Sequence, residues 1–317
     1  MVAQDLNKAI VITILFTIIF GFFALPYAGG GDYFFHFEKA KNGCENLNAG
    51  CFIYTPLFHI IASPFTFHPN AFFYFTVFLI GFVTPMLLFL ISKKWEIVWF
   101  YFAITSYFWF FIDGIFPQAL AGILLLLILL IKDWKIQALI VLLSVFVHGH
   151  GFFLTAVTFL SIHLWEAIKK DVEDFSFKEK LQKIFLGCSG IFGNSRPETL
   201  DEPVANLVST GVEFKLGNIL ILFFKIFPIP YFYFSIKHLI KEKKDFHLLF
   251  ITIISLIAGL LFSHRIFYVI PLVLLLALTD FYYNLNESHR KLFLISSLVM
   301  FGYQLYSWLN FKLVCSI

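Results

Sequence analysis

Residues 70–91 read NAFFYFTVFLIGFVTPMLLFLI, a run without a charged side chain. A hydrophobic run of this length matches the roughly 20 residues that a transmembrane helix needs. It also far exceeds the length of a buried strand. A helix satisfies its backbone hydrogen bonds by itself, which lipid requires. We therefore expect residues 70–91 to form a membrane-spanning helix.

The rest of the chain follows the same pattern. It is 60% hydrophobic and 14% charged, whereas soluble domains carry about 25% charged residues. Other apolar runs cover residues 9–25, 97–112, 118–131, 136–165, 217–236, 246–263, 266–283 and 292–311. We expect one all-α transmembrane domain over residues 1–317, a multi-pass bundle of about nine to eleven helices in the cell membrane. The run 136–165 is either a tight hairpin or one bent helix.

The charged residues predict how the bundle is oriented. Cytoplasmic loops of membrane proteins are enriched in Lys and Arg. This rule places the N-terminus in the cytoplasm together with the basic clusters Lys93/Lys94, Lys132/Lys135, Lys237–Lys244 and Arg290/Lys291. We expect a first outer loop with interfacial helices at 26–69 and a hydrophilic region at 166–216. The basic residues do not form the continuous stripe that nucleic-acid binding needs, so the lipid bilayer is the expected partner.

The first outer loop holds the first candidate site. Asp32 follows a glycine run and is suited either to cap a helix or to take part in chemistry. His36 lies four residues further on and would share its helical face, whereas Glu38 would lie about 120° away from Asp32. A carboxylate and an imidazole so placed could accept a proton or hold a metal.

Two further polar sites fall on the same predicted outer side. Asp113 is a candidate catalytic acid, or alternatively the N-cap of the next helix. Arg265 follows His264 at the boundary of another apolar run. Its guanidinium could reach the membrane surface, or it could bind the phosphate of a lipid.

Other residues of interest have weaker patterns. His148 and His150 flank Gly149, and either satisfied buried imidazoles or ligands at a helix break would explain them. Cys44 and Cys51 share one polar loop and could form a disulfide if that loop faces an oxidising environment.

Four segments together resemble the GT-C superfamily of membrane glycosyltransferases, which includes oligosaccharyltransferase catalytic subunits and protein mannosyltransferases. They are Gly-Gly-Asp32-Tyr-Phe-Phe-His36, Tyr54-Thr-Pro-Leu-Phe-His59, Phe116-Pro-Gln-Ala-Leu120 and His264-Arg265-Ile-Phe-Tyr-Val-Ile-Pro-Leu272. The resemblance implies a polyprenyl-phosphate sugar as donor and inversion at the anomeric carbon. It implies that Asp32 is the base, and that Arg265, with His264, binds the donor phosphate.

Two departures from the family's pattern matter. Asp113 stands alone instead of in an Asp-x-Asp pair, so dependence on a divalent cation, Mg²⁺ or Mn²⁺, stays open. The sequence lacks the large C-terminal soluble domain of oligosaccharyltransferase subunits, so we expect a small member.

Two other functions compete with this one. A transporter or lipid-binding protein could use the same polar cavity without catalysis, although transporters commonly show internal repeats and none is evident here. Gly187-Cys188-Ser-Gly-Ile191 is similar to the nucleophile segment of exosortase-type cysteine proteases, but a hydrophilic stretch follows it here.

Overall fold

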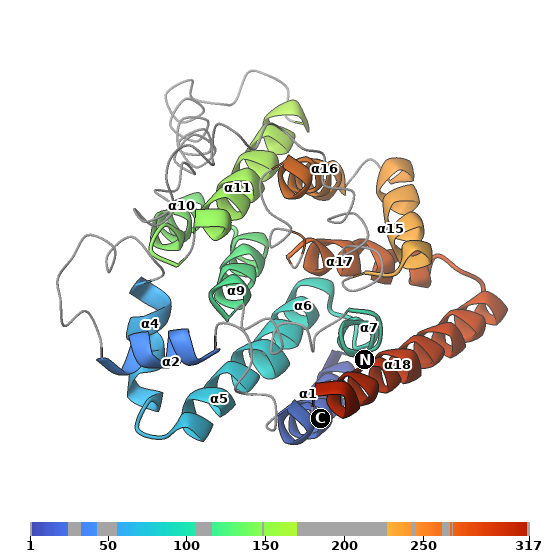
Figure 1. Ribbon diagram of the computed structural model, residues 1–317. Helices are drawn as coiled ribbons and strands as arrows, with labels where there is room; N and C mark the ends of the chain where they lie inside the picture. The colour runs from blue at the N-terminus through green and yellow to red at the C-terminus, as the bar shows by residue number, and fades with distance from the viewer. Residues whose placement is uncertain are drawn as a thin grey trace.

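The computed structural model describes residues 2–24, 33–42, 56–105, 116–147, 149–169, 227–242, 245–261, 267 and 269–315. Every regular element among these residues is helical, which confirms the expected all-α class for the described part of the chain (Figure 1). The α-helices are α1 Val2–Ala24, α2 Tyr33–Asn42, α4 Pro56–Ala62, α5 Pro69–Phe78, α6 Thr84–Ser92, α7 Glu96–Ile104, α9 Phe116–Leu130, α10 Trp134–Ser144, α11 Gly149–Lys169, α15 Ile229–Lys241, α16 Phe246–Leu261, α17 Ile270–Tyr283 and α18 Glu287–Cys315.

Two stretches of helix are long and apolar enough to cross a membrane. One is Gln4–Gly21 within α1, and the other is the continuous helix Pro69–Ser92, which contains the run 70–91. Several other apolar helices, such as α9 and α17, have between 10 and 17 residues. These fall below the roughly 20 residues of a full crossing.

The helix Pro69–Ser92 is not uniform, because a π-helical turn at Leu79–Val83 separates α5 from α6. A π turn disturbs the regular hydrogen-bond ladder of a helix. Here neighbouring helices donate to its carbonyl groups. The hydroxyl of Thr17 donates to Gly81 O at 2.7 Å, and that of Tyr101 donates to Ile80 O at 2.8 Å. These bonds tie α1 and α7 to the middle of the helix Pro69–Ser92.

The run 136–165 forms a helical hairpin of α10 and α11. The hydroxyl oxygens of Ser144 and Thr155 lie 2.6 Å apart, and Gln137 Oε1 lies 2.8 Å from His163 Nε2. The earlier residue of α10, Gln137, contacts the later residue of α11, His163, and the later one, Ser144, contacts the earlier one, Thr155. The two helices are therefore antiparallel. The structure therefore agrees with the hairpin rather than with the single bent helix.

Helix α9 lies in the middle of the described fold (Figure 1). It packs against α6 on one side and against α10 and α11 on the other. The long helix α18 runs along α7, where Trp99 Nε1 donates to Ser297 Oγ at 2.7 Å and Gln304 Nε2 donates to Ile104 O at 2.8 Å. The first residue of α9, Phe116, lies beside the short helices α2 and α4.

Candidate functional site

Two buried histidines meet where α2 contacts α4. Nδ1 of His36 lies 3.0 Å from Nε2 of His59, and the two side chains are 1% and 8% exposed. One nitrogen must donate and the other accept, because two lone pairs or two protons cannot face each other at this distance. The pair therefore shares one proton along this contact.

Aromatic rings enclose the histidine pair. The ring of Phe116, the first residue of α9, lies 6.3 Å from that of His36 and 6.5 Å from that of Phe58. Tyr33 packs edge-on against Phe116 at 6.0 Å, and its hydroxyl donates to Pro69 O at 2.7 Å. Burial raises the pKa of Tyr33 to about 12, so this hydroxyl keeps its proton and remains a donor.

The apolar surroundings keep His59 neutral. Burial, and to a smaller extent the charge of Lys39, lower the pKa of His59 from its usual value near 6.5 to about 4. An uncharged imidazole is the form that accepts a proton or binds a metal. At neutral pH the site therefore offers an imidazole without a charge of its own.

Glu38 does not join this pair. Its side chain is exposed and accepts a hydrogen bond from Asn42 Nδ2 at 3.0 Å. Glu38 lies two positions after His36, and side chains at that spacing point in very different directions on a helix. Of the two accessory candidates on α2, His36 therefore lies in the buried site and Glu38 on the surface.

Helix α2 begins at Tyr33, one residue after Asp32. The other residues predicted for the site lie outside the described residues, or have only their backbone described. The residues outside the described part are Asp32, Asp113, His148, His264, Arg265, Cys44 and Cys51. The backbone of His150 is described as part of α11, but its side chain is not.

The described parts of three of the four family-like segments meet in this site. The first segment contributes Tyr33 and His36, the second Phe58 and His59, and the third Phe116. The fourth segment reaches the same helix further along. Leu272 packs so closely on Gly122 of α9 that a Cβ there would lie 2.9 Å from Leu272 Cδ1.

Comparison with known proteins adds no relative. No family model, curated protein or solved structure matches this chain. The function must therefore be argued from the residues themselves.

The histidine partner His59 was not among the residues singled out from the sequence. Its segment, Tyr54 to His59, is aromatic and contains proline, which suits the membrane interface, and it carries part of the resemblance. His36 and His59 are 23 residues apart, and no helical spacing relates residues on two different helices. Its place in an aromatic, proline-containing segment is the only signal that could have found it.

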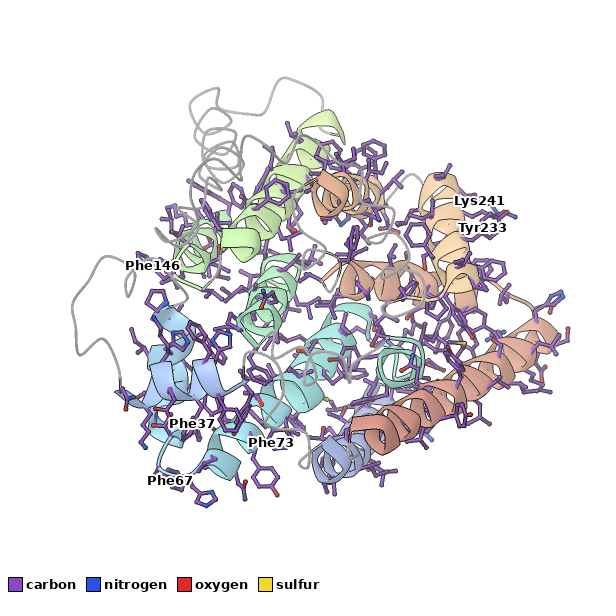
Figure 2. The ribbon with its side chains drawn as sticks, viewed as in Figure 1. Phe37, Phe67, Phe73, Phe146, Tyr233 and Lys241 are labelled. Carbon is purple, nitrogen blue, oxygen red and sulfur yellow. The ribbon has the colours of Figure 1, made fainter. Side chains whose placement is uncertain are left out.

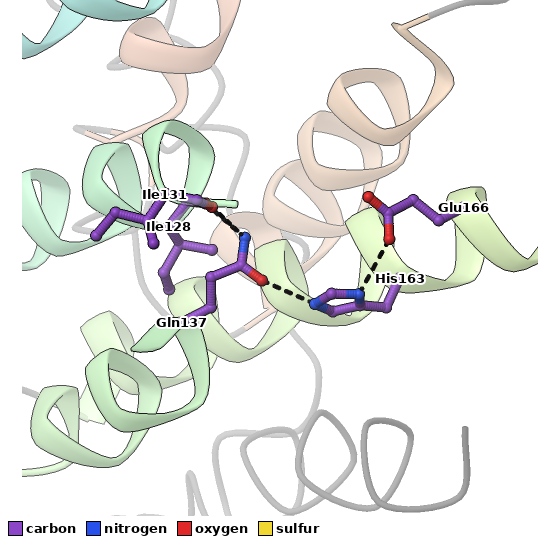
Figure 3. A network of polar contacts seen from close by, with 5 residues as sticks. All are labelled: Ile128, Ile131, Gln137, His163 and Glu166. Carbon is purple, nitrogen blue, oxygen red and sulfur yellow. Dashed lines mark hydrogen bonds and ion pairs between the residues drawn. The ribbon is translucent and has the colours of Figure 1, made fainter. Parts of the chain in front are cut away.

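A second buried polar group, also unforeseen, lies in the α10–α11 hairpin (Figure 3). Gln137 Nε2 donates to Ile128 O at 2.9 Å and to Ile131 O at 2.7 Å, near the end of α9. The amide nitrogen faces these carbonyls, so Oε1 faces His163 and must accept from its Nε2–H. His163 Nδ1 lies 3.4 Å from Glu166 Oε2. This network satisfies the carbonyl groups at the end of a helix, which is a structural role.

Proposed function

We propose that this protein is a small, multi-pass membrane glycosyltransferase of the GT-C type. It transfers a sugar from a polyprenyl-phosphate donor to an acceptor at the outer face of the membrane. The observation that carries the proposal is the pair His36–His59, 3.0 Å apart. It joins two family-like segments against the first residue of a third, and His36 follows Asp32 by four residues in the sequence.

The exposed surface supports residence in a membrane. Large apolar side chains point outward over much of the described fold, for example Phe67 (81% exposed), Phe146 (52%) and Tyr233 (55%), which lie at the periphery in Figure 2. On α18 the exposed Leu292, Ile295 and Val299 lie three and four residues apart and so share one helical face, and an apolar face of this kind suits a lipid environment. In our proposal the shorter apolar helices cross a locally thinned bilayer or lie within the bundle.

Contacts between basic segments support the proposed orientation. Lys8 Nζ lies 5.6 Å from the ring of Trp95, and Lys94 Nζ lies 4.2 Å from the ring of Tyr283. Tyr283 ends α17, shortly before the basic pair Arg290/Lys291. Lys8 and Lys94 thus lie near the end of α17 that leads to Arg290/Lys291, which is compatible with these regions lying on one side of the membrane.

The proposed reaction is a direct displacement. Asp32 takes the proton of the acceptor hydroxyl, whose oxygen forms the new bond to the anomeric carbon. The bond from that carbon to the phosphate oxygen breaks, and the polyprenyl phosphate leaves with the electron pair. Arg265, with His264, offsets the charge that develops on the phosphate. His36 and His59 hold α2, whose first residue directly follows Asp32, against α4 and α9.

Sugar transfer measured in membranes tests this proposal. A radiolabelled polyprenyl-phosphate sugar is supplied to membranes that contain the wild type, Asp32→Asn or Glu38→Gln. We expect Asp32→Asn to lower transfer by a factor of about 10² or more, since this is the typical contribution of a general base. Glu38→Gln is the matched carboxylate control and should retain transfer, because Glu38 is exposed.

Equal transfer by wild type and Asp32→Asn would refute the role of Asp32. Repeating the assay after chelation, and again with Mg²⁺ or Mn²⁺ added back, decides whether sugar transfer depends on a divalent cation. The variant Cys188→Ala separates this activity from that of an exosortase-like protease. Sugar transfer by Cys188→Ala should equal that of the wild type. Loss of all activity in this variant would favour the exosortase-like protease.

A further inference from the structure

A second group of potential ligands lies far from the histidine pair in sequence, on helices α15, α16 and α17. His238 is in the last turn of α15, Asp245 directly precedes α16, and Asp280 is in the last turn of α17. One ligand atom from each residue lies within 4.8 Å of the other two. We propose that His238, Asp245 and Asp280 bind a divalent transition-metal cation.

The fold brings these three residues together through short connections and close helix packing. Helix α15 packs against α17, which it crosses in Figure 1, and α16 packs against both. The end of α15 turns back on itself, because Glu242 N donates to His238 O at 2.8 Å and Asp245 N donates to Glu242 O at 3.2 Å. The Phe281 ring, 6.3 Å from that of His238, is stacked on Phe234 at 5.0 Å. The positions of the ligands are therefore set by packed elements.

The environment of the group suits a divalent cation. His238 is 4% exposed, and both aspartates are only partly exposed. Asp280 is the one acidic residue in α17, whose sequence is otherwise apolar apart from Thr279 and the two terminal tyrosines. A cation bound beside Asp280 would offset the charge of its carboxylate at the end of this apolar helix. Two carboxylates together match the charge of one divalent cation.

The ligand types select the metal. One imidazole nitrogen and two carboxylate oxygens suit Mn²⁺, Fe²⁺ or Zn²⁺, whereas Mg²⁺ and Ca²⁺ prefer oxygen ligands alone. Three protein ligands also leave coordination positions for water or for a bound group. That is the arrangement of a reactive metal site, since closed structural sites use four protein ligands.

This site is separate from the proposed glycosyltransferase centre. It shares no residue with Asp32, Asp113, His264 or Arg265, and it lies at the end of α17 where Lys94 contacts Tyr283. In the proposed orientation that end faces the cytoplasm. Metal binding is measured without sugar transfer, so the two proposals succeed or fail independently.

Metal retention by the purified full chain in detergent tests the site. The protein is stripped with a chelator, incubated with MnCl₂, ZnCl₂ or MgCl₂ alone, desalted and measured by elemental analysis. We expect the wild type to retain about one Mn²⁺ or Zn²⁺ per chain with a raised thermal midpoint. Mg²⁺ should be lost on desalting. His238→Ala and Asp280→Asn should weaken binding at least about tenfold.

Matched controls exclude binding elsewhere. His289→Ala removes an exposed imidazole and Glu287→Gln an exposed carboxylate, and both should retain metal as the wild type does. Asp280→Asn keeps the shape of the side chain, so it tests ligation even if His238→Ala does not fold. Wild type that retains neither Mn²⁺ nor Zn²⁺ would overturn the proposal. Retention by folded Asp280→Asn equal to that of the wild type would overturn it as well.

Discussion

Tyr283 and Glu96 are joined by a hydrogen bond of 2.6 Å, which the tyrosine hydroxyl donates to Oε2 of the carboxylate across 187 residues of sequence. Glu96 begins α7 and is only 8% exposed, and Tyr283 ends α17. Lys94 covers the other side of the tyrosine, with its Nζ 4.2 Å from the ring centre. The bond therefore joins the start of α7 to the end of α17, beside Lys94.

Removing the donor of this bond should destabilise the fold. Tyr283→Phe leaves the buried carboxylate of Glu96 without its partner hydroxyl, and an unsatisfied buried group costs about 1–3 kcal/mol. The measurement is the thermal midpoint in detergent, with Tyr303→Phe as the control because Tyr303 is exposed. The prediction is wrong if both variants unfold at the same temperature.

The neutral state of His59 makes stability depend on pH. Its folded-state pKa of about 4 lies below the usual value of 6.5, so the unfolded chain binds more protons between these values. Stability should therefore fall as pH drops from about 6.5 to about 4. Above that range His59 should contribute no pH dependence to stability. At about 1.4 kcal/mol per pKa unit, the loss approaches about 3 kcal/mol.

Thermal unfolding of the wild type and His59→Gln across this pH range tests the effect. The wild type should lose more stability than the variant as the solution is acidified, because glutamine does not titrate. Parallel curves for the two proteins would contradict the assignment of a neutral His59.

Gln137 should be needed to hold the end of α9. Gln137→Leu keeps a similar volume but removes the donor to Ile128 O and Ile131 O and the acceptor for His163. We expect a loss of about 1–3 kcal/mol in the free energy of unfolding. Gln4→Leu, on the exposed start of α1, is the comparison. Similar unfolding of both variants would show that the network contributes little.

Gly259 and Gly122 should respond differently to an added methyl group. At Gly259 the new Cβ would lie 2.1 Å from the Phe267 ring, whereas at Gly122 it would lie 2.9 Å from the end of the flexible Leu272 side chain. A ring cannot yield as a methyl can, so Gly259→Ala should cost about 1–3 kcal/mol and Gly122→Ala less. Unfolding midpoints of the two variants give the comparison, and the reverse order would contradict it.

Much of the helical architecture could be predicted from the lengths of the apolar runs. Residues 70–91 and 118–131 correspond closely to Pro69–Ser92 and to α9. The run 97–112 did not predict where α7 ends, because Thr105 after its last residue, Ile104, has an extended backbone with ψ of 143°. Hydrophobicity alone gives no sign of that change. Element boundaries depend on local backbone geometry as well as on composition.

The candidate site was only partly predictable, for a different reason. His36 was found because its spacing from Asp32 fits one helical face, a relationship within a single element. The pair His36–His59 and the group around His238 depend on how separate helices pack, and sequence spacing carries no information on that. Gln137 was missed because a single amide in an apolar run has no pattern.

The π-helical turn at Leu79–Val83 divides the long helix into two segments with different rotational phases. One residue more is accommodated there than in a regular turn, so every side chain beyond Val83 is rotated by about 100° from the position that an unbroken helix would give it. A seven-residue repeat counted from Pro69 as if the helix were regular therefore assigns the side chains after Thr84 to the wrong face of the helix. A chain shorter by one residue within this turn could restore an ordinary helix and still present the same faces on both sides of it.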